Sequence, residues 1–235
     1  MSTAPEAGLQ DVSVVIPALN EAQTIDLTLA ALAPLRRSGG EVIVADGGSS
    51  DNTREIAATL CDRVIEAPQG RARQMNAGAA VARGDLLWFL HADSPPSPAV
   101  LQEIARAGKD GTLWGRFDIR LSGKGLLLRL TEWLMNRRSH LTGICTGDQG
   151  IFVRRTQFES SGGYADIALM EDIELSRRLR QHAWPRRLRG PLPTSSRRWE
   201  DHGVIRTILT MWRLRLAYYL GADPDKLARI YRGKP

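Results

Sequence analysis

The segment Val12-Ser-Val-Val-Ile-Pro-Ala-Leu-Asn-Glu21 joins a short β-branched run to a polar turn. Apolar side chains then recur at helical spacing, at Ile25, Leu29 and Leu32. This pattern predicts a strand, a loop and a helix over 21–35. The same arrangement returns in Glu41-Val-Ile-Val-Ala-Asp-Gly-Gly-Ser-Ser-Asp51, which precedes a helical stretch over 53–61.

The rest of the chain continues this alternation. Residues 63–66 predict a third strand, 70–83 a third helix, and the apolar run 86–90 a fully buried strand. Four strands alternating with three helices predict a parallel, doubly wound sheet flanked by helices. Farther on, we expect strands over 114–121 and 150–154 and helices over 126–136 and 171–181, followed by an amphipathic helix from residue 204.

Composition is typical of one globular domain that fills residues 1–235. The 235 residues are 43% hydrophobic and 25% charged, which is enough to build a core without metals or disulfides. Lys and Arg outnumber Asp and Glu by 32 to 26, and the formal charge of +6 favours an anionic partner. The two cysteines fit no zinc spacing, and no secretion signal or membrane span is recognised. A cytoplasmic protein is therefore expected.

Three polar clusters follow three of the predicted strands. They begin at Pro17, at Asp46 and at His91, and the carboxyl ends of parallel strands meet at one edge of a sheet. No Gly-rich dinucleotide or P-loop motif is present. Because an acidic edge needs a cation or a ribose and base, a divalent metal that bridges a nucleotide diphosphate satisfies both needs.

Four motifs together carry a family resemblance. They are VVIPALNE at 14–21, ADGGSSDNT at 45–53, GDLLWFLHAD at 84–93 and MED at 170–172. In order and spacing they resemble a family 2 glycosyltransferase of the Rossmann-like GT-A fold, over about residues 12–200. The segment TGDQGIFVR at 146–154, with the HAD triplet, also resembles the small bacterial transferases associated with radical-SAM and selenodomain proteins, which are described as arsenosugar-type.

The resemblance implies a nucleotide-sugar site in the first half of the chain, residues 12–110. Asp46 and Glu21 would lie near the base or ribose; the residues that would border the nucleotide are Pro17, Asn20, Glu21, Asp46 and Asp51. For Asp51 alone, an N-cap of the following helix is the alternative. Met75 stands where the family shows an arginine, so Arg71 or Arg73 would supply the positive charge, unless both lie on a solvated helix face.

The resemblance also implies a metal, Mn²⁺ or Mg²⁺. His91-Ala-Asp93 is similar to the family's DxD motif with His in the first position, so Asp93 is the expected ligand and His91 a neighbour or ribose contact. An unreactive loop histidine is the alternative for His91. His202 would complete the coordination, or else be a surface histidine.

Residues 111–200 would hold the acceptor and the catalytic groups. Glu171-Asp172 resembles the pair that carries the general base of inverting members, with Asp172 as the base and Glu171 orienting the acceptor. As plain sequence, two acids that open a helix are dipole partners. Arg198 matches an RW motif beside the diphosphate, but Ser195 replaces its glutamine, which argues against polymer synthesis. The eight arginines between 177 and 198 would lie near the diphosphate or form a solvated face.

The C-terminal segment, 204–235, contains a helix with one apolar stripe. Its members are Ile205, Ile208, Leu209, Trp212, Leu216, Tyr219 and Leu220, with arginines on both flanks. Such a stripe suits a membrane surface, but burial against the domain or a second subunit is the alternative.

These observations favour a metal-dependent, inverting glycosyltransferase. Its donor would be a nucleotide-diphosphate sugar, with uridine preferred by resemblance, and its acceptor a small molecule or a lipid-linked one, with the protein in the cytoplasm or peripheral at the membrane. A sugar-phosphate nucleotidyltransferase and a silent nucleotide-sugar-binding or membrane adaptor protein are the alternatives. A nucleic-acid partner is not expected, and the oligomeric state is left open.

Overall fold

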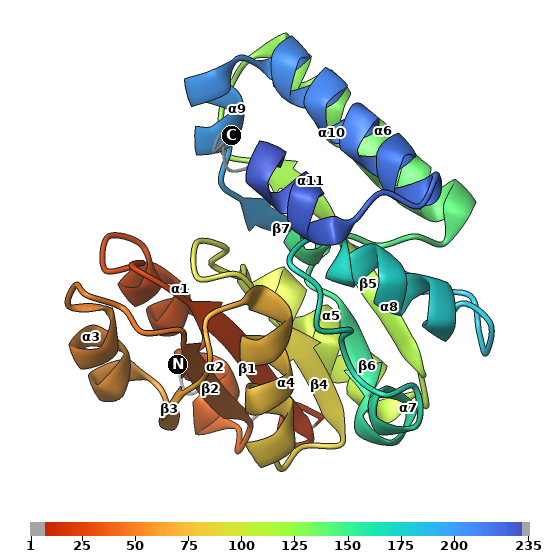
Figure 1. Cartoon of the computed structure of the whole chain (residues 1–235). Coiled ribbons are helices and arrows are strands. Elements are labelled where there is room, and N and C mark those ends of the chain that lie inside the picture. The colour runs from red at the N-terminus through yellow and green to blue at the C-terminus, as the bar shows by residue number, and fades with distance from the viewer. Residues whose placement is uncertain (1–7, 232–235) are drawn as a thin grey trace.

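The computed structural model describes residues 8–231, apart from the side chains of Arg198 and His202. Its centre is a seven-stranded sheet in the order β3-β2-β1-β4-β6-β5-β7, with helices against both faces (Figure 1). The strands are β1 (Val12–Ala18), β2 (Glu41–Asp46), β3 (Arg63–Glu66), β4 (Leu86–Phe89), β5 (Trp114–Leu121), β6 (Phe152–Arg154) and β7 (Arg186–Thr194). The predicted mixed α/β architecture is confirmed.

The helices follow the strands in alternation through the first half and cluster toward the end of the chain. They are α1 (Ile25–Ala31), α2 (Ala33–Arg37), α3 (Thr53–Leu60), α4 (Arg71–Val81), α5 (Pro98–Lys109), α6 (Leu126–Thr142), α7 (Arg155–Ser160), α8 (Glu171–Leu179), α9 (Arg197–His202), α10 (Val204–Tyr219) and α11 (Pro224–Tyr231). A single 3₁₀ turn, η1 (Gly147–Gln149), precedes β6.

The first four strands are parallel, as the sequence predicts. β1 lies between β2 and β4 and pairs with both, and its last residue, Ala18, is opposite Asp46 at the end of β2. β6 is antiparallel to its neighbours β4 and β5, whereas β5 and β7 are parallel. The sheet is therefore mostly parallel, with one short reversed strand in the middle.

Alternate residues of the buried strands pack against opposite helix layers. Val14 belongs to a core cluster with residues of α1, α3 and α5, and its neighbour Val15 belongs to a cluster with residues of α4, α7 and α8. This two-sided burial explains why β1, β2 and β4 read as continuous apolar runs.

Two predicted helix boundaries were wrong. The helix expected over 21–35 is divided into α1 and α2. The reason is Pro34, which has no backbone N–H to donate and whose ring would clash with the carbonyl group of the preceding helical turn. The helix expected over 126–136 continues to Thr142 and ends at Gly143, whose φ of 66° fits a left-handed C-terminal cap.

The C-terminal segment forms two helices in place of one. Leu214 of α10 and Leu227 of α11 pack in a small cluster with Ile173 of α8, so α10 is held to the domain. Most of the predicted apolar stripe of α10 faces outward, with Leu209 60% and Leu216 61% exposed. Among the described helices, none combines the length and the apolar character that crossing a bilayer requires.

Close contact between α4 and β1 gives a test of the fold. A Cβ on Gly78 would lie 2.3 Å from Cγ1 of Val15. We expect Gly78→Ala to lower the free energy of unfolding by about 1–3 kcal/mol through overpacking, although alanine favours a helix by about 1 kcal/mol. Urea unfolding measures the change.

Gly125→Ala is the matched control, because a Cβ at that position would have no atom within 4 Å and its φ is negative. Adding Val15→Ala to Gly78→Ala should recover part of the loss, since it removes the methyl group that is in the way. A Gly78→Ala protein as stable as the parent would show that α4 does not lie this close to β1.

Candidate active site

One pocket lies where β1 ends and α4 begins, and we call it the β1–α4 pocket. Pro17, Glu21, Gly70 and Arg71 line it. Gln74 closes its floor, because its buried amide Nε2 donates to the carbonyl oxygens of two strand-end residues, Ala18 at 2.7 Å and Ala45 at 2.8 Å. The ends of β1 and β2 are thus held by a side chain where the sheet itself stops.

Two loops beside this pocket are tied together by hydrogen bonds. The backbone N–H of Asn20 donates to Ser49 Oγ at 2.9 Å, and Ser50 N–H donates to Asn20 Oδ1 at 2.8 Å. Glu21 N–H donates to Thr53 Oγ1 at 2.8 Å. The loop after β1 therefore takes its shape from the loop after β2.

The two aspartates of the second loop act within this network. The buried carboxylate of Asp46 accepts the backbone N–H groups of Gly48 and Ser49, each at 3.0 Å. Asp51 accepts the N–H of Thr53 at 3.1 Å and that of Ala22 at 3.2 Å, and the Thr53 contacts lower its pKa. The N-cap of α3 is Asn52 and not Asp51, so the alternative of an N-cap is wrong, although Asp51 bonds to Thr53, the first residue of that helix. Neither aspartate lines the pocket.

A second pocket adjoins the first, and we call it the β4–α8 pocket. Three elements converge there: His91 and Asp93 follow β4, Gly147 and Asp148 belong to η1, and Glu171 and Asp172 open α8. Arg71, Glu171, Leu169 and Tyr231 line both pockets, so the two form one continuous site.

Backbone hydrogen bonds orient Asp172. Its Oδ2 accepts the N–H of Gly147 at 2.9 Å and its Oδ1 accepts the N–H of Ile173 at 2.7 Å. A Cβ on Gly147 would lie only 2.9 Å from His91 Nε2, so a residue larger than glycine would require the buried imidazole of His91 to move.

Burial and like charge set the protonation of this carboxylate. Burial first and the neighbouring Glu171 second raise the pKa of Asp172 to about 6, against the lowering effects of the Gly147 and Ile173 N–H groups and of Arg71. Burial, followed by the positive charge of Arg71, lowers the pKa of His91 to about 3. Near pH 7 the site therefore offers a carboxylate poised to bind a proton beside a neutral imidazole.

Arg71 is the positive charge shared by the two pockets. Its pKa is raised although burial opposes this, because Glu171, Tyr231, Asp172 and Asp93 act on it. Arg73, the other candidate, lies on the other side of α4 and forms an ion pair with Asp166 at 2.7 Å. It lines neither pocket.

Backbone strain is also concentrated here. Asn20 (φ 56°) and Met170 (φ 72°) are the non-glycine residues with positive φ among residues 8–231. Asn20 lies in the loop after β1, and Met170 immediately precedes Glu171. Methionine seldom adopts this conformation, so the surrounding packing must hold it, as is common at functional sites.

The lining of the β4–α8 pocket suits a cation. Among its described side chains, four are carboxylates, Asp93, Asp148, Glu171 and Asp172, and two are guanidiniums, Arg71 and Arg215. Asp148 Oδ1 is buried without a hydrogen-bond partner. No group of three or more ligating side chains is preassembled within the described part of the chain. Carboxylate oxygens are the donors that Mg²⁺ and Mn²⁺ favour, so Asp93 and Asp148 fit such an ion.

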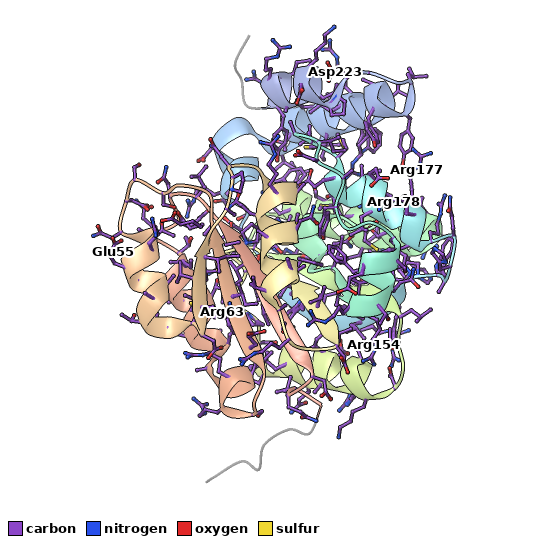
Figure 2. The ribbon with its side chains drawn as sticks, turned by 60° about the horizontal axis from the view of Figure 1, so that its bottom comes forward. Glu55, Arg63, Arg154, Arg177, Arg178 and Asp223 are labelled. Carbon is purple, nitrogen blue, oxygen red and sulfur yellow. The ribbon has the colours of Figure 1, made fainter. Side chains whose placement is uncertain are left out.

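Two predicted residues cannot be placed. The side chains of Arg198 and His202 lie outside the described residues, although their backbone belongs to α9. The other arginines between 177 and 197 line neither pocket. Figure 2 shows Arg177 and Arg178 on α8, and Arg178 bonds to Glu174 and to the carbonyl of Gly163. Arg178, Arg186 and Arg187 form ion pairs with Glu174, Asp110 and Asp118, whereas the charge of Arg197 acts on Glu21 at the β1–α4 pocket.

Several lining residues were not predicted from sequence. Asp148 and Gly147 belong to the quoted TGDQG segment, whose polar residues were a signal that could have been used. Tyr231, Met211 and Arg215 come from α10 and α11. These helices carry no local pattern that indicates which side faces the pocket.

Comparisons with known proteins find glycosyltransferases among the relatives of this chain. The chain is 31% identical over 196 residues to a probable glycosyltransferase, YdaM of Bacillus subtilis, which covers 73% of the chain and 47% of YdaM. It is 26% identical over 203 residues to a beta-monoglucosyldiacylglycerol synthase of Trichormus variabilis, and this match covers 76% of the chain and 43% of the synthase. The chain thus spans less than half the length of these relatives.

A solved structure shares the fold. Glucosyl-3-phosphoglycerate synthase from Mycobacterium tuberculosis, crystallised with Mn²⁺, uridine diphosphate and glucosyl-3-phosphoglycerate, superposes with a TM-score of 0.57 at 21% identity. The match covers 78% of this chain and 70% of that one, and it shows a GT-A fold.

The family model described as glycosyl transferase family 2 matches residues 13–157, more than half of the chain and including β1, β2, β4 and η1. The chain belongs to glycosyl transferase family 2.

Proposed function

We propose that this protein is an inverting, metal-dependent glycosyltransferase that moves a sugar from a nucleotide-diphosphate donor to an acceptor hydroxyl. The observation that carries the proposal is Asp172, a carboxylate with a pKa of about 6, held by Gly147 N–H in a pocket at the strand ends. A carboxylate with these properties is suited to accept a proton at neutral pH.

The donor nucleotide fits the β1–α4 pocket. Pro17 and Glu21 line it directly, whereas Asn20, Asp46 and Asp51 act by shaping the two loops. Arg71 reaches both pockets and would bind the diphosphate between them. Uridine is the preferred base, which the uridine diphosphate bound to the M. tuberculosis enzyme supports.

Asp93 is the proposed ligand of Mn²⁺ or Mg²⁺. Asp148, with its unpartnered oxygen, is the described side chain best suited to assist it, and His202 stays a predicted ligand. A bound cation would offset the negative charge of the leaving diphosphate. Mn²⁺ in the M. tuberculosis structure supports this assignment.

The reaction needs one proton transfer and one displacement. The Asp172 carboxylate takes the proton of the acceptor hydroxyl as that oxygen forms a bond to the anomeric carbon. The bond from this carbon to the diphosphate oxygen breaks on the opposite side, and the nucleotide diphosphate leaves with its electron pair. Glu171 raises the pKa of Asp172 and lies where it can orient the acceptor.

The acceptor is either a small molecule or lipid-linked, and the protein would work in the cytoplasm or at the inner membrane face. The name of the Trichormus relative, a synthase of a glucosyl lipid, supports a lipid. The narrower resemblance to radical-SAM-associated transferases stays a prediction from residues 91–93 and 146–154.

Replacement of the base tests the mechanism. Asp172→Asn should reduce sugar transfer, or donor hydrolysis if no acceptor is at hand, by about 10²- to 10⁴-fold. Binding of uridine diphosphate should be retained, since Asp172 lies beyond the β1–α4 pocket. The matched control is Asp26→Asn, an exposed aspartate of α1. Equal turnover by Asp172→Asn and the parent would exclude Asp172 as the base, whereas no sugar transfer or donor hydrolysis by the parent would favour the nucleotidyltransferase or silent-protein alternatives.

The raised pKa predicts the acid limb of the pH profile. Asp172 must be deprotonated to act, so kcat/KM should fall as the pH drops through about 6. Glu171 contributes to this raised pKa, and in Glu171→Gln the limb should therefore move to lower pH. The groups that face Asp172 are Glu171, Arg71 and the Gly147 and Ile173 N–H groups. If the acid limb of the kcat/KM profile stays at the same pH in Glu171→Gln, the group that titrates there is not Asp172.

Thermal unfolding with nucleotides tests the donor and metal assignments. A diphosphate that binds the folded state must raise the Tm. Among the uridine, guanosine, cytidine and thymidine diphosphates, we expect the uridine compound to give the largest shift, and Mn²⁺ to increase it. Asp93→Ala should abolish the increase from Mn²⁺. Asp85→Ala, an exposed aspartate at the other end of β4, should keep it. A full Mn²⁺ effect in Asp93→Ala would refute the assignment of Asp93.

A further inference from the structure

An apolar groove runs between α6 and α10, which lie side by side at the edge of the molecule in Figure 1. We call it the α6–α10 groove. It encloses about 230 Å³, below the roughly 300–1,000 Å³ of ordinary small-molecule pockets. Its apolar lining consists of Leu134, Met135, Trp199, Ile208, Met211 and Trp212. A space of this size and character suits a single alkyl chain.

The groove opens toward the site already described. Trp199, Met211 and Arg215 line both the α6–α10 groove and the β4–α8 pocket. A molecule whose chain lies in the groove can therefore place its other end in the pocket that contains Asp172.

Two arginines give this junction a positive charge. Arg215 lines both spaces, its Nε is buried without a partner, and its guanidinium makes no hydrogen bond or ion pair with any described residue. Arg138 lines the groove; its Nη2 donates to Ser139 Oγ at 2.9 Å, and its Nε is also buried and unpartnered. Because a buried donor without a partner is costly, a negatively charged ligand at this point would be stabilised chiefly by Arg215, since Asp148 and Asp172 already act on the charge of Arg138.

The outer faces of the same helices match a lipid surface. Leu126, Leu130 and Trp133 of α6 are 88%, 52% and 56% exposed, and Ile205 and Leu209 of α10 are 62% and 60% exposed. Arg137 lies over the Trp133 ring at 5.7 Å, and Arg206 and Arg213 are exposed on α10. Apolar and aromatic side chains mixed with arginine are typical of the water–lipid boundary, from which a lipid would enter the groove.

We propose that the acceptor is an anionic lipid, with its hydrocarbon chain in the α6–α10 groove and its charged head bound by Arg215. The accepting hydroxyl then lies in the β4–α8 pocket beside Asp172. This inference rests on the proposed function, because it assigns the acceptor of the same site. A second protein copy would cover the apolar helices but would leave the two buried Nε donors without an anion.

Calorimetric titration with dodecyl phosphate, kept below its micelle concentration, tests the proposal. Inorganic phosphate supplies the head without the chain, and dodecyl maltoside supplies the chain with a neutral head. We expect dodecyl phosphate to bind at least tenfold more tightly than either probe.

Two pairs of variants separate the groove from the outer surface. Ile208→Trp fills the groove and should weaken dodecyl phosphate at least tenfold, whereas Leu209→Trp adds the same bulk on the exposed face and should change binding less than twofold. Arg215→Gln should weaken dodecyl phosphate about tenfold and leave dodecyl maltoside unchanged. Arg213→Gln, an exposed arginine on the same helix, should change neither. Leu134→Trp replaces Ile208→Trp if the latter unfolds.

The outcomes distinguish the inference from the function on which it rests. Equal effects of Ile208→Trp and Leu209→Trp on the binding of dodecyl phosphate would place the lipid on the outer surface and overturn the proposal. No binding of dodecyl phosphate by a protein whose Tm still rises with uridine diphosphate would refute the lipid acceptor and leave the donor site intact. A protein that does not bind dodecyl phosphate, and whose Tm does not rise with uridine diphosphate, would count against both the lipid acceptor and the proposed function.

Discussion

The parallel pairing of β1 with both β2 and β4 is the constraint on which the rest of the site depends. It brings the ends of three strands, and the loops that follow them, to one edge of the sheet. The sheet stops there, and Gln74 bonds the free carbonyls of Ala18 and Ala45. The loop after β1 and the loop after β2 hold each other in place, because Asn20 forms hydrogen bonds with Ser49 and Ser50. The β1–α4 pocket, where we propose that the nucleotide binds, is thus shaped by these strand ends and loops.

One hydrogen bond in the second half of the chain holds the carboxylate of Asp172 at this edge of the sheet. Gly147 N–H holds Asp172 Oδ2, and so joins the turn before β6 to the first turn of α8. Because β6 lies beside β4, this turn lies next to His91, and a side chain on Gly147 would collide with it. Met170, with its positive φ, is the N-cap of α8 and immediately precedes Glu171 and Asp172, which line the pocket. The strain at Met170 and the missing side chain at Gly147 serve the same purpose, which is to place one carboxylate.

Much of the first half could be predicted because its signals are local. Apolar runs, turn residues and helical spacing lie within about ten residues of one another, and the family motifs occupy the same segments. Contacts between distant segments could not be predicted in this way. Arg71 and Arg73 were equal candidates in sequence, yet two positions along a helix point to different sides, and only Arg71 reaches the pockets. Arg215 and Tyr231 depend on how α10 and α11 dock. The end of α6 was missed for a local reason, because the apolar pattern weakens before the helix ends at its glycine cap, Gly143.

Charge balance links the two pockets and the groove. Four described carboxylates and two guanidiniums line the β4–α8 pocket, so adding a nucleotide diphosphate would increase an existing negative excess. In the proposed site a divalent cation at Asp93 would remove that conflict, and Arg71, on which Glu171, Asp172 and Asp93 act, would offset the charge of the diphosphate. At the α6–α10 groove the charge of the lining is positive, because Arg138 and Arg215 lie there. An anionic group is repelled at the centre of the site and attracted at this end. A lipid with a negative head would therefore be oriented along the groove, with its hydroxyl toward Asp172 and its chain toward the exposed faces of α6 and α10.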